Sequence, residues 1–262
     1  MDVIICVPVY RSASYLETLF SGLYKLEPQP SKVIFVENNS TDNTLIKVAR
    51  YKRPHEVIRF WLRDDWIKHS DTVYDAVAIA RQFGLQRSRE LKPDYLLFFD
   101  SDMIINQKDL LDELTRWPTD IVGGAYLRLF HVDAVPEYSQ PEGASVMLAA
   151  SWKHPQIPNM LQRRSRALKI PFDDTVLTVG GGCLLLNNKV FNDERINFYP
   201  IQIENHSEDF GYVEAARRFG YTVGLDSAAR ISHLITPSKN WFKPWNVGGK
   251  LVMGKEKPHF TD

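Results

Sequence analysis

Residues 96–102 read LLFFDSD. Four consecutive apolar residues are typical of a strand that is covered on both faces of a sheet. The carboxylates that follow, Asp100 and Asp102, are separated by one residue and cannot both point into the core. Where a strand ends in a turn, two such side chains can converge on a divalent cation, which binds carboxylate oxygens together with phosphate oxygens of a substrate. The motif therefore favours a metal site over an ordinary surface turn.

The residues before this motif alternate between short apolar runs and stretches with helical spacing. The runs typical of strands are Val3–Val9, Lys32–Val36, Val57–Leu62 and Tyr95–Phe99. The first predicted helix follows Ser12 or Ser14, either of which can cap it. Two further helices are predicted over Asn43–Tyr51 and Thr72–Arg89. Strands that alternate with helices predict βαβ units and a parallel sheet, in which ligands bind beyond the carboxyl ends of the strands.

Beyond residue 106 the alternation is less regular. The spacing predicts helices over Asp109–Trp117 and Phe210–Phe219, the second of which is closed by Gly220. The predicted strands are Ile121–Arg128, Thr175–Leu186, Tyr221–Leu225 and Ala229–His233. Residues 135–174 are rich in Pro, Ser, Gln and basic residues and show no sustained periodicity, which is typical of a functional or mobile loop.

Composition narrows the class of protein. The chain has 262 residues, of which 44% are hydrophobic and 24% charged, so it can bury a sizeable core as one large α/β unit. Its net charge of +0 argues against a dedicated nucleic-acid binder, which needs a basic excess. Cys6 and Cys183 lie in apolar runs, which indicates reduced core cysteines. Because neither a signal peptide nor an apolar run of bilayer length is visible, we expect a cytoplasmic protein, at most peripheral to a membrane.

Several segments, taken in order, resemble one known family. They are residues 4–10 (IICVPVY), 35–44 (FVENNSTDNT), 80–85 (ARQFGL), the DSD motif, 181–183 with 188–191 (GGC and NKVF), 207–210 (SEDF) and 229–233 (ARISH). Over Val3 to His233 the chain resembles the family 2 group of GT-A glycosyltransferases, whose corresponding motifs include VVDDGSTDGT and ARNxGL. The resemblance implies a transferase that moves a sugar from a nucleoside-diphosphate sugar, with UDP-sugars favoured, to a glycan or other acceptor hydroxyl. A nucleic-acid acceptor is possible but is not indicated.

The resemblance also implies a fold and its division. We expect a single α/β GT-A-like domain, in which a Rossmann-like half with a mixed central sheet binds the nucleotide sugar over residues 1–105. Residues 106–240 would form the acceptor-binding and catalytic half. Residues 241–262 combine aromatic side chains with Gly248, Gly249 and Lys250, a composition that suits a flexible lid or tail.

By the same resemblance, residues at the ends of the early strands bind the nucleotide sugar. They are Pro8, Tyr10, Glu37, Arg81, Asp100 and Ser101. Of these, Glu37, Tyr10 and Pro8 would hold the base and ribose. A divalent metal, Mn²⁺ or Mg²⁺, would be bound by Asp102 and His233, with Asp100 contacting the ribose and water on the metal. The metal would neutralise charge on the departing diphosphate.

The catalytic pair implied by the resemblance is Asp209 with Glu208. Asp209 would take the proton from the attacking hydroxyl in an inverting transfer, while Glu208 supports the loop or the acceptor. Acceptor contacts are expected from Gly181, Gly182, Trp152 and Trp241. The two tryptophans also fit an ordinary packing role.

Some of these residues have plainer interpretations. Arg81 also fits a solvated charge on a helix, and His233 an ordinary core or surface histidine. Glu208 and Asp209 are both expected to favour the N-terminus of the following helix electrostatically. The chain departs from the family pattern where Glu37 replaces Asp, Asn38-Asn39 replaces Asp-Gly and Gln82 replaces Asn. Asn39 can still adopt the left-handed turn conformation that Gly supplies, and Gln82 still offers an amide.

Three other functions remain open on sequence grounds. A Mg²⁺-dependent phosphatase of the haloacid-dehalogenase type also carries an apolar strand before D-x-D, but that motif normally follows the first strand of its fold. A sugar-phosphate nucleotidyltransferase needs a glycine- and arginine-rich loop after the first strand, and residues 7–11 read VPVYR. A catalytically inactive module would bind a nucleotide or glycan without turnover.

Overall fold

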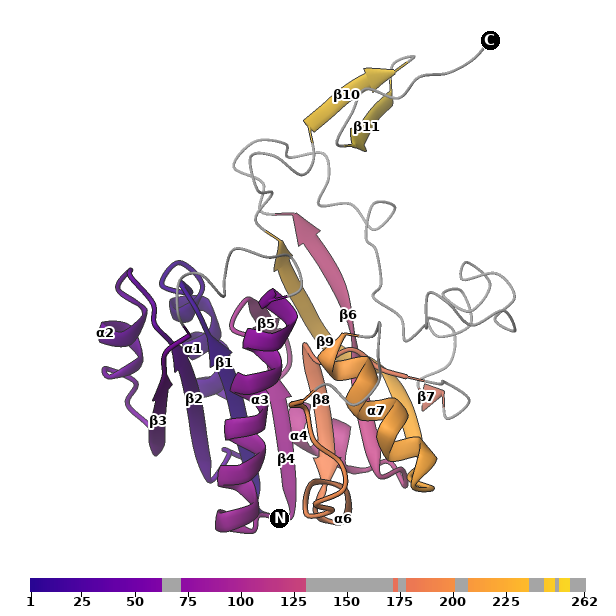
Figure 1. The fold of residues 1–262 in the computed structure, drawn as a ribbon. Helices are drawn as coiled ribbons and strands as arrows, with labels where there is room; N and C mark the ends of the chain where they lie inside the picture. Colours follow the sequence, from indigo (N-terminus) through magenta and orange to yellow (C-terminus); the bar gives the residue numbers. More distant parts are fainter. Residues whose placement is uncertain are drawn as a thin grey trace.

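The computed structural model describes residues 1–62, 72–130, 172–173, 178–200, 207–235, 243–247 and 250–254. Within these ranges nine strands form one sheet (Figure 1). They are β1 (Val3–Val9), β2 (Lys32–Asn38), β3 (His55–Phe60), β4 (Tyr95–Phe99), β5 (Met103–Ile105), β6 (Ile121–Phe130), β7 (Phe172–Asp173), β8 (Cys183–Asn187) and β9 (Val223–Ile235). Their order is β3-β2-β1-β4-β8-β6-β9-β5, and β7 pairs with β9.

The sheet changes from parallel to antiparallel strand pairing at β4. Strands β1 to β4 are parallel to one another, as the alternating sequence predicts. Strand β8 then runs antiparallel to both β4 and β6, and β5 runs antiparallel to β9. The predicted mixed central sheet of a single α/β fold is therefore confirmed. The turn that carries the DSD motif connects β4 to β5, and it brings the carboxyl end of the parallel half close to β9.

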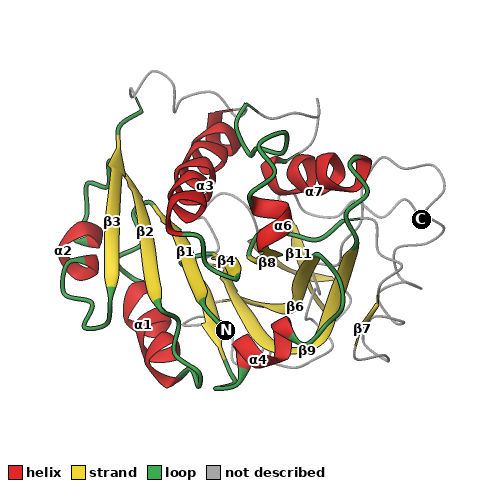
Figure 2. Ribbon diagram, turned by 90° about the horizontal axis from the view of Figure 1, so that it is seen from below, coloured by secondary structure: helices red, strands yellow, loops and turns green. Residues whose placement is uncertain are grey.

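Helices cover both faces of the sheet, as Figure 2 shows. On one face, α1 (Leu16–Lys25), α2 (Thr44–Val48) and α4 (Leu110–Thr115) pack over one buried apolar cluster. On the other, α3 (Thr72–Leu91), α6 (Asn188–Phe191) and α7 (Glu208–Arg218) cover a second. Both faces of the central strands are buried, which is why their sequences are continuous apolar runs. Within the described residues, no helix is long and apolar enough to cross a bilayer.

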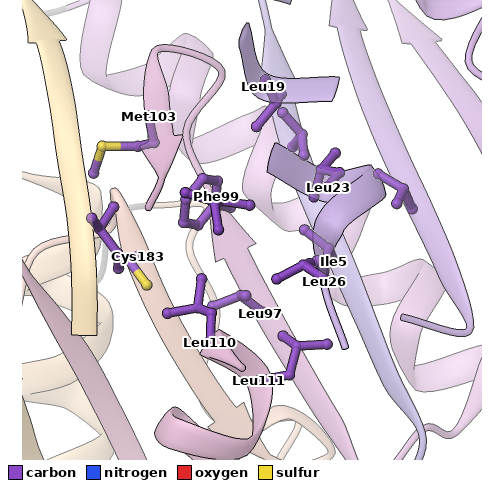
Figure 3. Close-up of a cluster of buried hydrophobic side chains, with 14 of the residues drawn as sticks. Ile5, Leu19, Leu23, Leu26, Leu97, Phe99, Met103, Leu110, Leu111 and Cys183 are labelled. Atoms are coloured by element: carbon purple, nitrogen blue, oxygen red, sulfur yellow. The ribbon is translucent and has the colours of Figure 1, made fainter. Parts of the chain in front are cut away.

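The first cluster is drawn in Figure 3, where Leu97 and Phe99 of β4 lie in the same apolar cluster as Leu19 and Leu23 of α1 and Leu110 of α4. Alternate residues of the same strand, such as Phe98, enter the second cluster under α3. Cys6 and Cys183 are both buried and free, which confirms the prediction of reduced core cysteines. A Cβ at Gly84 would overlap the Cys6 sulfur, so glycine at that position lets α3 approach β1 closely.

Several boundaries differ from the predictions. Helix α1 begins after Tyr15, so neither Ser12 nor Ser14 is at the cap position, and no side chain caps the helix. The Ser12 hydroxyl bonds the Ser101 hydroxyl. The predicted strand Tyr221–Leu225, from Val223 on, and the predicted strand Ala229–His233 are parts of the single strand β9. Its pairing with β6 shifts register between Gly124 and Tyr126, opposite a bulge that Asp226 stabilises by accepting the N–H groups of Ala228 and Ala229.

Other differences concern elements that the predictions shortened, lengthened or missed. Strand β8 begins at Cys183, whereas the predicted strand begins at Thr175. Residues 178–182 form no strand, and residues 175–177 lie outside the described ranges. Helix α2 is shorter than Asn43–Tyr51, and α7 begins at Glu208. Strand β5, helix α6 and the hairpin of β10 (Lys243–Val247) and β11 (Lys250–Gly254) were not predicted. The role of residues 241–262 as a lid stays a prediction.

The C-terminus of α7 is as predicted. Gly220 has φ +89°, and its N–H donates to the carbonyl of Arg217. The N–H of Tyr221 donates to the carbonyl of Ala216, so the last turn is closed by two bonds that a left-handed residue makes possible. The helix therefore ends where glycine allows the chain to reverse.

Candidate active site

The polar residues selected from the sequence gather where β4 ends and α7 begins. The turn after β4 is held by two backbone bonds. The Asp100 N–H donates to the Gly182 carbonyl at 3.1 Å, and the Met103 N–H donates to the Asp100 carbonyl at 3.2 Å. The side chains of Asp100 and Asp102 are 31% and 32% exposed. Both carboxylates are therefore accessible at the carboxyl edge of the sheet.

Asp102 and His233 are brought together by the pairing of β5 with β9, in which Met103 lies opposite His233. The Leu234 N–H donates to the Asp102 carbonyl at 2.8 Å, which fixes the turn to β9. As a result, Asp102 Oδ2 and His233 Nε2 are 3.1 Å apart. The Tyr126 ring lies edge-on against the imidazole, with centroids 5.6 Å apart. Residues 131 positions apart in sequence thus form one polar pair.

This pair fits a divalent cation by its donor chemistry. Carboxylate oxygens bind Mg²⁺, and imidazole nitrogens bind small divalent metals such as Zn²⁺, at about 2.0–2.1 Å, so adjacent ligands on one ion lie about 3 Å apart. In the described part of the chain, no group of three or more His, Cys, Asp or Glu side chains is arranged around a common point. The remaining ligands of such a metal would therefore be water and phosphate oxygens, as is usual for Mg²⁺ sites.

Arg81 of α3 links the two acidic motifs. Its guanidinium donates to Asp100 Oδ1 at 2.8 Å, and its Nη1 lies 3.1 Å from Glu208 Oε1. The side chain is 2% exposed, so the interpretation as a solvated helix charge is wrong. Asp100, Glu208 and Asp209 hold the pKa of the guanidinium above its ordinary value despite burial. The backbone of Gly181 packs against this guanidinium so closely that a Cβ at position 181 would overlap the Arg81 Nη1.

The members of the pair at the start of α7 have different environments. Glu208 is 6% exposed, and burial together with the neighbouring charge of Asp209 raises its pKa to about 8, although Arg81 opposes the shift. Asp209 is half-buried and faces the glycine run, where its Oδ2 accepts the Gly181 N–H at 2.7 Å. Its Oδ1 accepts the Ser207 hydroxyl. The two carboxylates of this motif are therefore not equivalent.

The predicted acceptor residues are only partly described. Gly181 lies beside Asp209 and Gly182 beside the turn after β4, but their lack of a side chain serves packing. A Cβ at Gly182 would overlap the Met103 side chain, as one at Gly181 would overlap Arg81. Trp152 and Trp241 lie outside the described residues. Contacts of these four residues with an acceptor stay predictions.

The segments that follow β1 and β2 meet the DSD turn. The Ser101 hydroxyl bonds the Ser12 hydroxyl at 2.8 Å, and the Ser12 N–H donates to Thr44 Oγ1 at 2.7 Å. Pro8 lies within β1, and Tyr10, which follows β1, is 39% exposed. Sequence reasoning missed the Ser12–Thr44 connection. Its signal is a small hydroxyl residue between β1 and α1 and another at the first residue of α2.

Glu37 at the end of β2 is buried, with its side chain 1% exposed. It accepts the Ser40 N–H at 2.5 Å and the Arg59 Nε–H at 3.1 Å. Asn39, which has φ 42°, makes the tight turn that brings Ser40 back, so the predicted left-handed conformation is confirmed. Arg59 is a further residue that sequence reasoning missed, although it lies opposite Glu37 at the end of β3.

Gln82 has a structural role. Its Nε2 donates to Asn197 Oδ1 at 3.0 Å, and its Oε1 accepts the Phe198 N–H at 2.8 Å. The amide on α3 thus fixes a segment that lies between α6 and α7. Both its donor and its acceptor are used, which explains why an amide residue suits this position.

Comparisons with known proteins agree with this geometry. The sequence model described as Glycosyl transferase family 2 matches residues 4–190, well over half of the chain. Among solved structures, S. aureus TarS 1-349 has 20% identity and a TM-score of 0.56, covering 90% of this chain and 60% of that one. The structure of the same protein in complex with UDP-GlcNAc has 18% identity and a TM-score of 0.56, and the match covers 91% of this chain and 60% of that one.

A second neighbour is the mannosyltransferase PcManGT from Pyrobaculum calidifontis in complex with GDP-Man and Mn²⁺. It has 13% identity and a TM-score of 0.60, and the match covers 91% of this chain and 58% of that one. At such identities the likeness shows the fold alone, which confirms the predicted GT-A architecture. The chain spans about three fifths of the length of these structures. The search of curated proteins found no match.

Proposed function

Because the chain belongs to glycosyl transferase family 2, we propose that it transfers a sugar from a nucleoside-diphosphate sugar to an acceptor hydroxyl with the help of a divalent metal. The family is that of the nucleotide-sugar-dependent glycosyltransferases predicted from the motifs. Neighbouring structures contain UDP-GlcNAc in one case and GDP-Man with Mn²⁺ in another, which supports this donor class and this type of metal. We favour a UDP-sugar donor, a glycan or other hydroxyl acceptor, and inversion at the anomeric carbon.

The observation that carries the proposal is the 3.1 Å separation of Asp102 Oδ2 from His233 Nε2. These two atoms would hold Mn²⁺ or Mg²⁺ together with diphosphate oxygens of the donor. When bound, the metal supplies charge neutralisation to the departing nucleoside diphosphate. Asp100, which is fixed by Arg81, would contact the ribose and metal-bound water from the other end of the same turn.

Asp209 is the better candidate for the general base. Its Oδ2 accepts one hydrogen bond, from the Gly181 N–H, and a carboxylate oxygen has a second lone pair for the acceptor proton. The acceptor oxygen would attack the anomeric carbon as the bond to the diphosphate breaks, with its proton passing to Asp209. Glu208 is less suited, because it is buried against Arg81.

The test is a screen of nucleotide sugars for nucleoside-diphosphate release with Mn²⁺, with Mg²⁺ and with EDTA. Wild-type protein should release the nucleotide from at least one donor only when metal is present. Asp102→Ala should abolish the metal-stimulated binding of the corresponding nucleoside diphosphate, because one of the two protein ligands is lost. Calorimetry measures that binding, and circular dichroism checks that the variant is folded.

Asp112→Ala is the matched control, because Asp112 is an exposed carboxylate on α4 and should leave metal-stimulated binding unchanged. Unaltered metal-stimulated binding in Asp102→Ala would show that the metal site is wrongly assigned. Metal-dependent hydrolysis of a generic aryl phosphate with no action on nucleotide sugars would favour the phosphatase instead. Binding of donor without release from any sugar would favour the inactive module.

A further inference from the structure

Three residues lie in register across the carboxyl ends of the first three parallel strands. Val9 of β1 is opposite Glu37 of β2, which is opposite Arg59 of β3. Register partners project to the same face of a sheet, and the Arg59 Nε–H accordingly donates to Glu37 Oε2 at 3.1 Å. Trp61 follows β3, and the Arg59 guanidinium lies over its ring, 4.6 Å from the centroid.

The two members of the Glu37–Arg59 pair differ sharply in exposure. The Glu37 side chain is 1% exposed, whereas that of Arg59 is 41% exposed. One Glu37 oxygen accepts the Ser40 N–H and the other accepts Arg59. A nucleotide base that approaches this edge of the sheet therefore meets the guanidinium before it meets the carboxylate. The sequence-based expectation that Glu37 contacts the base directly is thus less favourable than contact through Arg59.

We propose that Arg59, oriented by Glu37 and Trp61, reads the base of the donor and selects a keto base over an amino base. This inference rests on the proposed function, because it assumes that a nucleoside diphosphate binds at this edge. Only the Nε–H is used by Glu37, and the guanidinium carries further N–H donors in a fixed plane. Those donors match O4 of uracil, or O6 and N7 of guanine. Cytosine and adenine present an amino donor at the same edge, which repels an N–H group.

The support from both neighbours explains why arginine suits this role. The Glu37 carboxylate fixes one edge of the guanidinium, and the face of Trp61, which is 61% exposed, limits its tilt. A planar group held in this way loses little freedom when it bonds a planar base. Lysine at position 59 would keep the ion pair with Glu37 but would offer neither the flat fork nor the stacking.

Calorimetry with UDP, GDP, CDP and ADP in Mn²⁺ tests the inference. Wild-type protein should bind UDP or GDP at least about tenfold more tightly than CDP and ADP, the order of discrimination expected of a good polar contact to a base edge. Arg59→Met should reduce that ratio to near one while the diphosphate still binds. Arg59→Lys should behave like Arg59→Met, although it retains the positive charge beside Glu37.

Arg53→Met is the matched control, because Arg53 is exposed and lies just before β3, at the opposite end of the strand. It should keep the wild-type ratio. Equal weakening of all four nucleotides in Arg59→Met, or a wild-type ratio in Arg59→Lys, would overturn base reading and leave Arg59 as a plain partner of Glu37. A wild type that binds without keto preference overturns it as well. If wild-type protein binds none of the four, the proposed function itself fails.

Discussion

The site contains two acidic motifs, and they are held in different ways. In the turn after β4, Asp100 and Asp102 are separated by one residue and are equally exposed, at 31% and 32%. At the start of α7, Glu208 and Asp209 are adjacent, and Glu208 is 6% exposed while Asp209 is half-buried. Consecutive residues of a helix point in directions about 100° apart, so one carboxylate enters the core and its neighbour faces the site.

Arg81 contacts both acidic motifs. It pairs with the first carboxylate of each motif, Asp100 and Glu208, and leaves the second to another partner. Asp102 lies against His233, and Asp209 accepts the Gly181 N–H. The carboxylates bound to Arg81 are anchored from within the fold, whereas Asp102 and Asp209 are the ones that we propose to meet metal and acceptor. Under this proposal, the first carboxylate of each motif has a positioning role and the second takes part in the chemistry.

The largest effect that tests this comparison concerns turnover. Asp209→Asn should lower kcat by roughly 10²–10⁴-fold, the usual contribution of a positioned base, with donor affinity nearly unchanged. Glu208→Gln should lower kcat much less and raise the KM for the acceptor, because Glu208 supports the loop from within the core. Both variants are assayed with one acceptor at saturating donor.

The reverse pattern, with turnover lost in Glu208→Gln and kept in Asp209→Asn, would exchange the two roles. Should neither variant lose turnover, an inverting transfer with a general base is wrong for this chain. A retaining transfer without such a base would then explain the activity better. Donor affinity, measured in parallel, separates either result from simple loss of the binding site.

The second effect concerns stability. Arg81→Met should lower the free energy of unfolding by about 3 kcal/mol, the lower end of the range for breaking a buried ion pair. The lower end applies because Asp100 is partly solvated and because Glu208 can take up a proton. Urea unfolding monitored by circular dichroism measures the change. Arg81→Met with Asp100→Asn should recover part of the loss, since the unpaired charge is removed as well.

Arg87→Met is the control for this prediction. Arg87 also lies on α3 and pairs with carboxylates, Glu56 and Glu90, but its side chain is 33% exposed. Pairs near the surface contribute about 0–1 kcal/mol, so this variant should change stability little. If Arg81→Met costs no more than Arg87→Met, Arg81 does not anchor the two motifs.

Much of the parallel half could be predicted from the sequence. The runs Val3–Val9 and Tyr95–Phe99 match β1 and β4 to the residue, because strands buried on both faces admit only apolar side chains. The proximity of Asp102 and His233 was implied by family resemblance, and the pairing of β5 with β9 accounts for it. The metal-binding and catalytic roles of these residues stay predictions.

What could not be predicted depends on contacts between distant segments. Arginine side chains are ordinarily exposed, and the burial of Arg81 is tolerable because the carboxylates of Asp100, Glu208 and Asp209 lie around it. Ser12 has the composition of a helix cap, yet its hydroxyl bonds Ser101, which is distant in sequence. The bulge in β9 rests on the carboxylate of Asp226 bonding the N–H groups two and three residues on, which strand propensity does not encode.

The last effect is the contribution of Glu208 to the dependence of stability on pH. Burial raises the pKa of this carboxyl from 4.5 to about 8, so between these values the folded state keeps a proton that the unfolded state has lost. The stabilisation is therefore complete below pH 4.5 and is lost as pH rises toward 8, at up to about 1.4 kcal/mol per pH unit. Glu208→Gln imitates the protonated carboxyl and should remove this slope.

Urea unfolding of wild type and Glu208→Gln at pH 5, 6 and 7 in EDTA measures the difference, since all other titrating groups are common to both proteins. The two stabilities should nearly coincide at pH 5, and the wild type should then fall progressively below the variant. Parallel curves would mean that Glu208 is ionised throughout and forms a full ion pair with Arg81. In that case Arg81 divides its charge between the two motifs. A diverging pair of curves instead assigns that charge at neutral pH to Asp100, so that the turn after β4 receives the electrostatic anchor and Glu208 lies beside Arg81 as a neutral carboxyl.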